Sequence, residues 1–381
     1  MKLHCSVVWI ALLFVSAAYA DEPAELVPLL KLNGAPPGSA TIDYEGLPIL
    51  KGEHAVVCPH TDELKFQLHN YLVHHDGKYW CLFSHGPEVE DLPTQFVSYA
   101  TSDDGLRWSK ARPVMPAPAA PYAYIARGLW VRDGELLALV AHFRDKGAFG
   151  VNKELKLEAY VWDKAADAWK FKGKLFDDAI NNFEPQLLKN GSWLMTRRDA
   201  RFNVYMLRGG VKALDDWESF PVMQRLQFRP LIPDEPLCLI LPDGRIHALF
   251  RNNAAEQKLF RSFSSDDGET WTKPELTNFP NATSKIYSVK LKSGVWVLIS
   301  NACVGGPPML AGRRSLYVSL SEDGLTFTKM ARLVIPMTKA TTFQYPHAIE
   351  HDGHLLIAFS QKKMQTEVLK VPLASIEALR K

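Results

Sequence analysis

The sequence predicts an all-β protein, a six-bladed β-propeller whose blades are four-stranded antiparallel sheets. Two observations lead to this prediction. An Asp-rich turn that continues into Gly and then an aromatic residue occurs three times along the chain. Six two-residue turns ending in Gly also separate pairs of short apolar runs at nearly constant spacing. Repetition of one hairpin and one turn indicates that a single supersecondary unit is repeated.

The Asp-rich turn is best developed in Ser264–Trp271, which reads Ser-Ser-Asp-Asp-Gly-Glu-Thr-Trp. Its Asp can accept hydrogen bonds from the turn backbone, and Gly268 can adopt the positive φ that the bend requires. Thr101–Trp108 is a second copy. Leu320–Phe327 is a weaker third copy, which on this alignment lacks the leading Ser and has Glu322 in place of Asp.

The hairpin turns define the blades. Successive turn glycines are 50 to 59 residues apart, and each hairpin is followed by a second pair of strands. We expect 40–58, which has no hairpin of this kind, to supply a strand that closes the ring with the last blade. The six turns are Asp76-Gly77, Asp133-Gly134, Asn190-Gly191, Asp243-Gly244, Ser293-Gly294 and Asp352-Gly353.

The N-terminus has the features of a secretory signal peptide. Lys2 precedes an apolar run from Ser6 to Val15, and Ala18-Tyr19-Ala20 is a small-residue cleavage site. We therefore predict a signal peptide at 1–20, a lead-in segment at 21–38 and one propeller domain at 39–381. The mature protein is predicted to be secreted or periplasmic after cleavage near Ala20.

Composition excludes several classes of partner. Lys and Arg number 44 and Asp and Glu 42, for a net charge of +2, which argues against a nucleic-acid partner. No apolar run is long enough to span a membrane, and we expect a monomer. Cys58, Cys81, Cys238 and Cys303 lack the spacing of a zinc site, so no metal or cofactor is predicted; a disulfide among them remains open.

Topology places the functional face opposite the Gly and Asp-rich turns, because the remaining loops all emerge at the other ends of the strands. Function on such scaffolds usually lies in loops around the axis. The candidates before each first strand are His69, Arg127, Glu184, Glu235, Lys285, Tyr287, Tyr345 and His347. Those after each second strand are Ser84, His85, His142, Arg144, Arg197, Arg198, Arg251, Asn301 and Gln361.

With its Asp-rich turns and six blades, the chain resembles the sialidase superfamily, whose propellers carry such Asp-box turns. The resemblance covers nearly the whole mature chain. It implies that Tyr345, at the start of the last blade, is a nucleophile and that Glu235 is its base. It also implies that arginines hold the substrate carboxylate, and the matching positions are Arg251 and Arg313, or its neighbour Arg314. Glu184 with Arg198 repeats the Glu-Pro and Arg pattern one blade earlier.

The chain also departs from the sialidase pattern in its first blade. Sialidases open with an arginine in an Arg-Ile-Pro-like motif, whereas His69 occupies the approximate position here. The family's acid is an Asp of the first blade, but Ser84–Glu88 contains none. Either His69 or His85 could act as an acid or base near neutral pH.

We therefore expect a secreted carbohydrate-active enzyme that hydrolyses a terminal anionic sugar, of sialic or uronic acid type, from a glycan or polysaccharide. One alternative is a glycosidase or lyase that uses His69 on a uronate-containing polysaccharide, and another is a glycan-binding propeller without catalysis. The predicted catalytic residues are Tyr345, Glu235, His69 and His85. The predicted substrate-binding residues are Arg144, Glu184, Arg198, Arg251, Arg313, Asn301 and His347.

Overall fold

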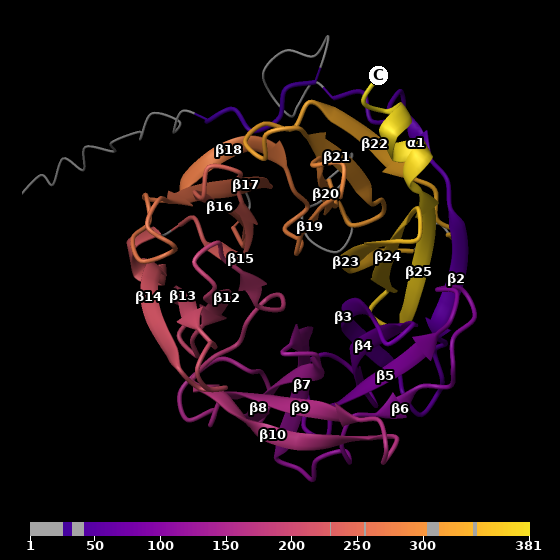
Figure 1. Ribbon diagram of the computed structural model, residues 1–381, viewed down its shortest axis with the longest axis vertical. Coiled ribbons are helices and arrows are strands. Elements are labelled where there is room, and N and C mark those ends of the chain that lie inside the picture. Colours follow the sequence, from indigo (N-terminus) through magenta and orange to yellow (C-terminus); the bar gives the residue numbers. More distant parts are fainter. Residues whose placement is uncertain (1–25, 33–41, 229, 255–256, 303–311, 338–340) are drawn as a thin grey trace, which may run out of the picture.

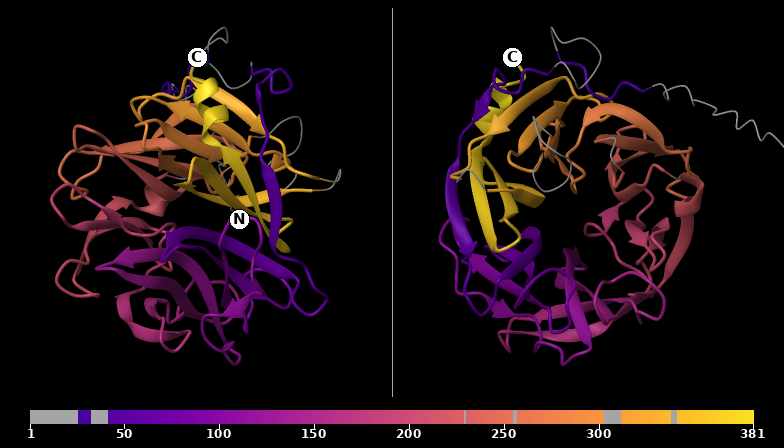
Figure 2. Two further views of the ribbon diagram at one scale, coloured as in Figure 1. Left: turned by 45° about the vertical axis from the view of Figure 1, so that its right-hand side comes forward. Right: turned by 180° about the vertical axis from the view of Figure 1, so that it is seen from behind.

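The computed structural model describes residues 26–32, 42–228, 230–254, 257–302, 312–337 and 341–381. The predicted signal peptide, most of the lead-in segment and Cys303 lie outside these residues. Six sheets are arranged in a ring around a central axis, as Figure 1 shows, and the two further views in Figure 2 agree with it. The predicted six-bladed β-propeller is confirmed.

Blades one to three are four-stranded sheets, each built from consecutive antiparallel strands. Blade one contains β3 (Phe66–His75), β4 (Lys78–Gly86), β5 (Phe96–Ser102) and β6 (Arg112–Pro113). Blade two contains β7 (Tyr122–Arg132), β8 (Glu135–Arg144), β9 (Lys156–Asp163) and β10 (Ala168–Asp177). Blade three contains β11 (Gln186–Leu187), β12 (Trp193–Arg198), β13 (Val204–Gly209) and β14 (Trp217–Met223), which precedes the 3-10 helix η2 (Arg225–Phe228).

Blades four to six complete the ring, and the last two recruit strands from the N-terminal part of the chain. Blade four contains β15 (Pro233–Ile240), β16 (Ile246–Asn252), β17 (Lys258–Ser264) and β18 (Glu275–Pro280). Blade five contains β19 (Tyr287–Lys290), β20 (Trp296–Ser300), β21 (Tyr317–Ser321), β22 (Lys329–Leu333) and the added β1 (Ile49–Leu50). Blade six contains β23 (Phe343–His351), β24 (His354–Gln361), β25 (Gln365–Pro372) and β2 (Glu53–Cys58), and the short helix α1 (Leu373–Ala378) follows it.

The expected ring closure is present, since β2 pairs antiparallel with β25 at the outer edge of blade six. The N-terminal chain also pairs further back along the ring. The strand β1 pairs in parallel with β22, and isolated bridges join Val27 to Thr277 and Leu30 to Phe327. The described residues of this segment, 26–32 and 42–58, therefore contact the outer edges of blades four, five and six.

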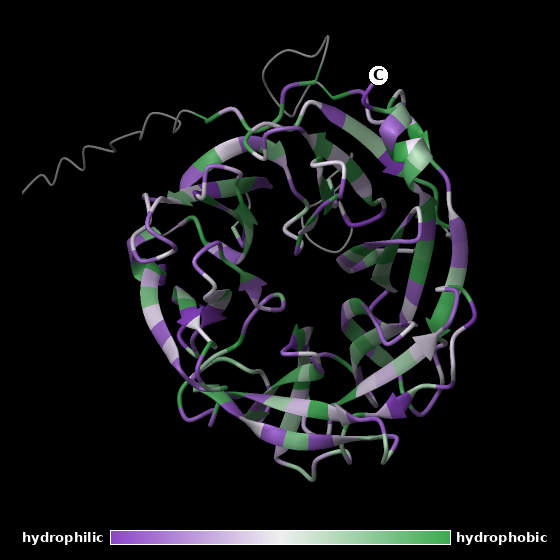
Figure 3. Cartoon of the chain, in the orientation of Figure 1, coloured by the Kyte–Doolittle hydropathy of each residue, from purple (hydrophilic) through white to green (hydrophobic). Residues whose placement is uncertain are grey.

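The hydrophobic core lies between neighbouring sheets. Leu139 of blade two packs in one cluster with Leu207 of blade three, and Leu72 of blade one packs with Val368 of blade six. Figure 3 shows hydrophobic and hydrophilic residues alternating along outer strands such as β14, as expected where one side of a strand is buried. The apolar side of each blade is thus covered by the next blade.

The Asp-rich turns are structural, and the third copy is more regular than the sequence alignment indicated. In Ser264–Trp271, the backbone N–H of Thr270 donates to Asp266 Oδ1 at 2.9 Å, and Gly268 has φ +89°. In the third copy, Ser321 Oγ donates to Asp323 at 2.9 Å. Asp323, rather than the aligned Glu322, therefore supplies the turn carboxylate. It directly precedes Gly324, whereas one residue separates Asp266 from Gly268 in the first turn.

Cys58, Cys81 and Cys238 are buried free thiols. Over the described part of the chain, no helix is long and apolar enough to cross a membrane. No cluster of His, Cys, Asp and Glu side chains suited to holding a metal ion is found among the same residues.

Candidate active site

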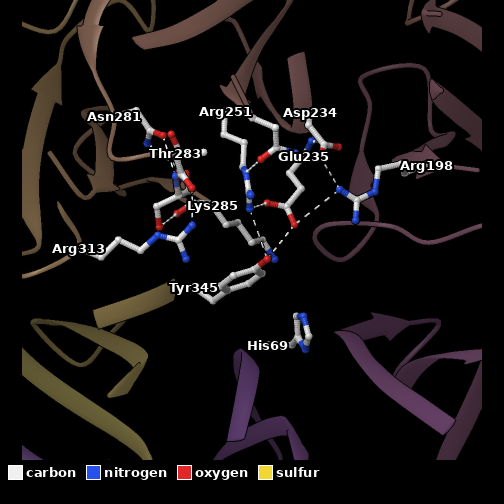
Figure 4. Close-up of polar contacts among 12 residues, drawn as sticks. His69, Arg198, Asp234, Glu235, Arg251, Asn281, Thr283, Lys285, Arg313 and Tyr345 are labelled. Carbon is white, nitrogen blue, oxygen red and sulfur yellow. Dashed lines mark hydrogen bonds and ion pairs between the residues drawn. The ribbon is translucent and has the colours of Figure 1, made fainter. Parts of the chain in front are cut away.

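A pocket of about 290 Å³ opens at the ends of the inner strands that lie opposite the Gly turns. Side chains from five of the six blades line it, and Figure 4 shows several of them converging from separate elements. The pocket is lined by Glu90, Asp91, Arg198, Phe202, Asp234, Glu235, Arg251, Asn253, Arg313, Tyr345 and Lys363.

Local backbone irregularities turn the key side chains toward the axis. The ladders of β3, β15 and β23 each shift register at the residue concerned, and His69, Glu235 and Tyr345 have φ values of +58°, +45° and +53°. A β-bulge leaves one residue unpaired and re-aims its side chain. Pro236 and Pro346 follow two of these residues, and proline has no N–H that a regular ladder would need.

Tyr345 and Glu235 form the central contact of the pocket. The Tyr345 hydroxyl donates to Glu235 Oε1 at 3.1 Å, and Arg251 forms a short ion pair with the other carboxylate oxygen. Arg251 Nη1 also lies 3.4 Å from the Tyr345 hydroxyl. Phenol, carboxylate and guanidinium are therefore mutually in contact, as Figure 4 shows.

Burial and neighbouring charges shift the pKa values of Tyr345 and Glu235 in opposite directions. Burial raises the pKa of Tyr345 well above its usual range, and the charge of Glu235 raises it further, against the opposing effect of Arg251. Burial alone would also raise the pKa of Glu235, but Arg251, then Arg198, hold it well below its ordinary value. The resting pair is thus a neutral phenol that donates to an ionised carboxylate.

Arg198 supports the same carboxylate from blade three. Its Nη1 lies 2.6 Å from Asp234 Oδ2 and 3.9 Å from Glu235 Oε1. The guanidinium is 4.0 Å from the ring centroid of Phe149. Arg198 is therefore engaged with carboxylates of the protein itself.

Two charged side chains of the pocket lack an ionic partner among the described residues, Arg313 and Asp91. Arg313 is 5% exposed and donates through Nη2 to the Thr283 carbonyl, while its Nε has no hydrogen-bond partner. Burial and the neighbouring Arg251 lower the pKa of Arg313. An anion beside Arg313 would offset both the burial of its charge and the repulsion from Arg251.

Asp91 is the matching unpaired acid, and its Oδ1 has no hydrogen-bond partner within the described structure. Burial, and then the neighbouring Glu90, raise the pKa of Asp91 to about 6, although Arg127 and Arg198 oppose this. Asp91 lies five residues beyond Gly86, the end of β4, in the loop that leads to β5. The first blade therefore does contribute an aspartate, and the conclusion from Ser84–Glu88 that it lacks one was wrong.

His69 lies beside the pocket, where its ring meets the Tyr345 ring edge-on with centroids 5.0 Å apart. Its Nδ1 is 3.0 Å from Ser84 Oγ, and its Nε2 is 3.4 Å from Glu90 Oε1. Burial, and then the charge of Arg127, lower the pKa of His69 to about 3, so the ring is neutral at physiological pH. Both ring nitrogens are already occupied by protein groups.

Glu184 and His347, both predicted to bind substrate, do not line the pocket. Instead, His347 Nε2 lies 3.1 Å from Glu184 Oε2, and the Tyr287 hydroxyl donates to Glu184 Oε1 at 2.8 Å. The Leu72 N–H donates to His347 Nδ1, which fixes the proton on Nε2. These residues link blades one, three, five and six.

The structure does not bring His85, Arg144 and Asn301 to the pocket either. His85 Nδ1 contacts Ser98 at 3.1 Å, and burial lowers the pKa of His85 to about 4. Arg144 pairs with Glu154 at 3.2 Å on the surface. Asn301 is buried and donates to two backbone carbonyls, so it serves the packing between blades five and six.

Five of the predicted residues, Tyr345, Glu235, Arg198, Arg251 and Arg313, thus line one pocket, whereas the prediction did not include its other charged members. Asp234 directly precedes Glu235, a position that sequence analysis could have included. Glu90, Asp91 and Lys363 lie in loops whose lengths follow no repeat, so their positions carried no usable sequence signal.

Comparison with known proteins agrees with this fold. Residues 216–357 match the BNR repeat-like domain. A Trypanosoma rangeli sialidase, solved in complex with sialic acid, superposes with a TM-score of 0.61 at 14% identity and covers 93% of this chain. Residues 216–357 are thus similar to the BNR repeat-like domain, and the fold of the chain is that of the solved sialidases. This sialidase-like chain spans 61% of the length of the T. rangeli protein.

Other solved structures share the fold of this sialidase-like propeller. The NanB sialidase from Streptococcus pneumoniae has a TM-score of 0.60 at 10% identity, over 83% of this chain and 70% of that one. A Dyadobacter fermentans protein of unknown function has a TM-score of 0.67 at 14% identity, over 84% of this chain and 98% of that one. No curated protein matches by sequence.

Proposed function

We propose that the protein is a carbohydrate-active hydrolase that removes a terminal acidic sugar, of sialic or uronic acid type, from a glycan. Tyr345 acts as the nucleophile, Glu235 as its base and Asp91 as the acid. The observation that carries this proposal is the 3.1 Å contact between the Tyr345 hydroxyl and Glu235, in a pocket that also contains unpaired Arg313 and Asp91. A phenol is a competent nucleophile only where a neighbouring base accepts its proton.

The reaction has two steps. In the first, the Tyr345 oxygen bonds to the anomeric carbon while its proton passes to Glu235, and Asp91 protonates the departing glycosidic oxygen. In the second, Asp91 takes a proton from a water molecule, which attacks the same carbon. The carbon–tyrosine bond breaks and the phenol oxygen recovers its proton from Glu235. One water is consumed, and the anomeric configuration is retained.

Arg313 is the primary contact for the sugar carboxylate. Arg198 and Arg251 are already engaged with Asp234 and Glu235, whereas Arg313 forms no ion pair within the described structure. A planar guanidinium offers two parallel charge-assisted hydrogen bonds to a carboxylate. Arg251, whose charge already lowers the pKa of Arg313, lies close enough to add a second positive charge at the same corner.

The histidine-dependent alternative has less support. An acid or base at neutral pH needs a pKa near that pH, whereas the pKa of His69 is lowered to about 3. Its ring nitrogens contact Ser84 and Glu90 rather than the pocket space. A non-catalytic glycan-binding role would not explain why the Tyr345 hydroxyl donates to the Glu235 carboxylate.

We also propose that the protein is exported and that its mature form begins at Asp21, on the pattern of residues 1–20. The intact mass of protein recovered from outside the host cytoplasm tests this. A mature chain that retains Met1 would rule it out.

The activity test compares wild type with Tyr345→Phe on a fluorogenic sialoside and a fluorogenic glucuronide. Wild type is expected to hydrolyse at least one, and the substitution to lower kcat by at least about a thousandfold, since it removes the bond-forming oxygen. Tyr205→Phe, on β13, is the matched control and should keep full activity. Wild type inactive on every acidic glycoside, or an active Tyr345→Phe variant, would refute the proposal.

A further inference from the structure

The first blade supplies no cation at the position where the sialidase resemblance implies one, since His69 is held neutral there. A different cation occupies the same corner of the pocket. Lys363, in the turn that follows β24 of blade six, lines the pocket together with Arg313 and Tyr345. We propose that Lys363 is a third cation for the sugar carboxylate and that Glu90 holds its charge when no substrate is bound. This inference rests on the function proposed above.

Lys363 is held beside the pocket by contacts with its own blade six and with blade one. Its N–H donates to the Gln344 side chain at 3.2 Å, one residue before Tyr345, and its carbonyl accepts from the Gln67 N–H at 2.9 Å. Its φ of +60° turns the side chain away from a regular strand path. The backbone of Lys363 is therefore held beside the pocket by contacts that do not involve Glu90.

Glu90 connects Lys363 to the rest of the site. One Glu90 oxygen forms a short ion pair with Lys363 Nζ, and the other lies 3.4 Å from His69 Nε2. Burial would raise the pKa of Glu90, but the His69 hydrogen bond and the Lys363 charge hold it well below its ordinary value. Glu90 is therefore ionised, and its carboxylate occupies the place beside Lys363 that a substrate carboxylate would take.

Exposure distinguishes this ion pair from the other two in the pocket. The side chains of Lys363 and Glu90 are each 27% exposed. Those of Arg251 and Glu235 are 13% and 3% exposed, and those of Arg198 and Asp234 are 8% and 2% exposed. A ligand can reach and open a partly exposed pair at far lower cost than a buried one.

The ion pair between Lys363 and Glu90 affects which sugars the pocket can select. A first-blade arginine would be a fixed cation, whereas Lys363 must be shared with Glu90. A carboxylate-bearing sugar therefore competes with Glu90, and once displaced, Glu90 can accept a hydrogen bond from a sugar hydroxyl. Removing the lysine and removing the glutamate charge should then change the affinity for an acidic sugar in opposite directions.

The test measures equilibrium binding by titration calorimetry in a Tyr345→Phe background, which prevents turnover. The ligands are N-acetylneuraminic acid, methyl glucuronide and the neutral methyl glucoside. Lys363→Met should weaken binding of an acidic ligand by about ten- to a hundredfold. Glu90→Gln should tighten it by about three- to tenfold, and Lys363→Arg should retain it. Methyl glucoside should respond to none of these changes.

Arg313→Met separates this inference from the proposed function. If Arg313→Met loses acidic-ligand binding while Lys363→Met retains it, the role of Lys363 is refuted and the proposed function stands. If Glu90→Gln weakens binding as much as Lys363→Met does, the pair is a structural link between blades and the inference fails. If the Tyr345→Phe parent and every variant made from it bind all three ligands equally, the carboxylate-binding pocket itself is refuted.

Discussion

At the scale of single residues, most charged side chains of the pocket form ion pairs with one another, and two do not. Arg198 with Asp234, Arg251 with Glu235, and Lys363 with Glu90 are ion pairs. Among the described lining residues, Arg313 and Asp91 remain without such a partner. Leaving a charge unpaired in a buried site is costly, so we infer that these two groups are reserved for a ligand.

The raised pKa of Asp91, about 6, predicts the pH dependence of the reaction. An acid acts only while protonated, so kcat/KM for a substrate with a poor leaving group should fall as pH rises through about 6. Asp91→Asn should remove this limb and lower kcat/KM by about a hundredfold or more for an alkyl glycoside. The effect should be much smaller for an aryl glycoside, whose leaving group needs little protonation. Steady-state kinetics from pH 4 to 8 measure both effects.

The assignment of Asp91 as the acid fails if Asp91→Asn lowers kcat/KM for the alkyl and the aryl glycoside by the same factor. It also fails if the variant keeps the wild-type alkaline limb. Asp103→Asn, on an exposed Asp-rich turn, is the matched control and should leave both profiles unchanged.

At the scale of elements, the N-terminal segment docks on blades four and five, upstream in the chain of the strand β2 that closes the ring. Asn278 of β18 accepts hydrogen bonds from the N–H groups of Leu29 and Leu30 at 2.8 and 2.9 Å, and its own amide donates to the Leu30 carbonyl at 2.8 Å. The side chain of Leu29 is fully buried. The predicted lead-in is therefore structured within 26–32, where it packs against blades four and five.

Truncating Leu29 tests how much this segment contributes. Leu29→Ala leaves a cavity and should lower the free energy of unfolding by about 2–5 kcal/mol. Leu226→Ala, at a site that is 74% exposed, is the matched control and should change it by less than about 0.5 kcal/mol. Urea denaturation followed by tryptophan fluorescence measures both variants. Equal stability of the two would show that residues 26–32 do not contribute to the fold.

At the scale of the whole molecule, the turns were sufficient to predict the fold and the end of the strands at which the pocket opens. Gly turns at regular spacing fix the blades, and the Asp-rich turns lie at the same end of the strands as the Gly turns, away from the pocket. Tyr345, Glu235 and Arg251 follow from that topology because each lies near the start or end of one of the two inner strands of its blade. Asp91 and Lys363 do not, since the loops that carry them have irregular lengths.

The roles of the predicted residues also depend on contacts that no spacing reveals. Glu184 precedes the first strand of blade three, and His347 lies on the same strand as Tyr345, yet the two residues bond to each other outside the pocket. Arg144 follows its strand as Arg198 does, yet it turns to a surface glutamate. The sequence thus indicated the side of the propeller on which the pocket lies, while side-chain pairing decides which residues there are available to a ligand.

The central claim is that Tyr345 bonds to the sugar, and it can be tested directly by mass spectrometry. In Asp91→Asn, an aryl glycoside of the acidic sugar should still react in the first step, while the second step lacks its base. The account predicts that the peptide containing Tyr345 gains the mass of one sugar residue and that Tyr345→Phe abolishes this gain. Wild-type turnover with no adduct on any peptide of Asp91→Asn, or an adduct on another residue, would contradict it.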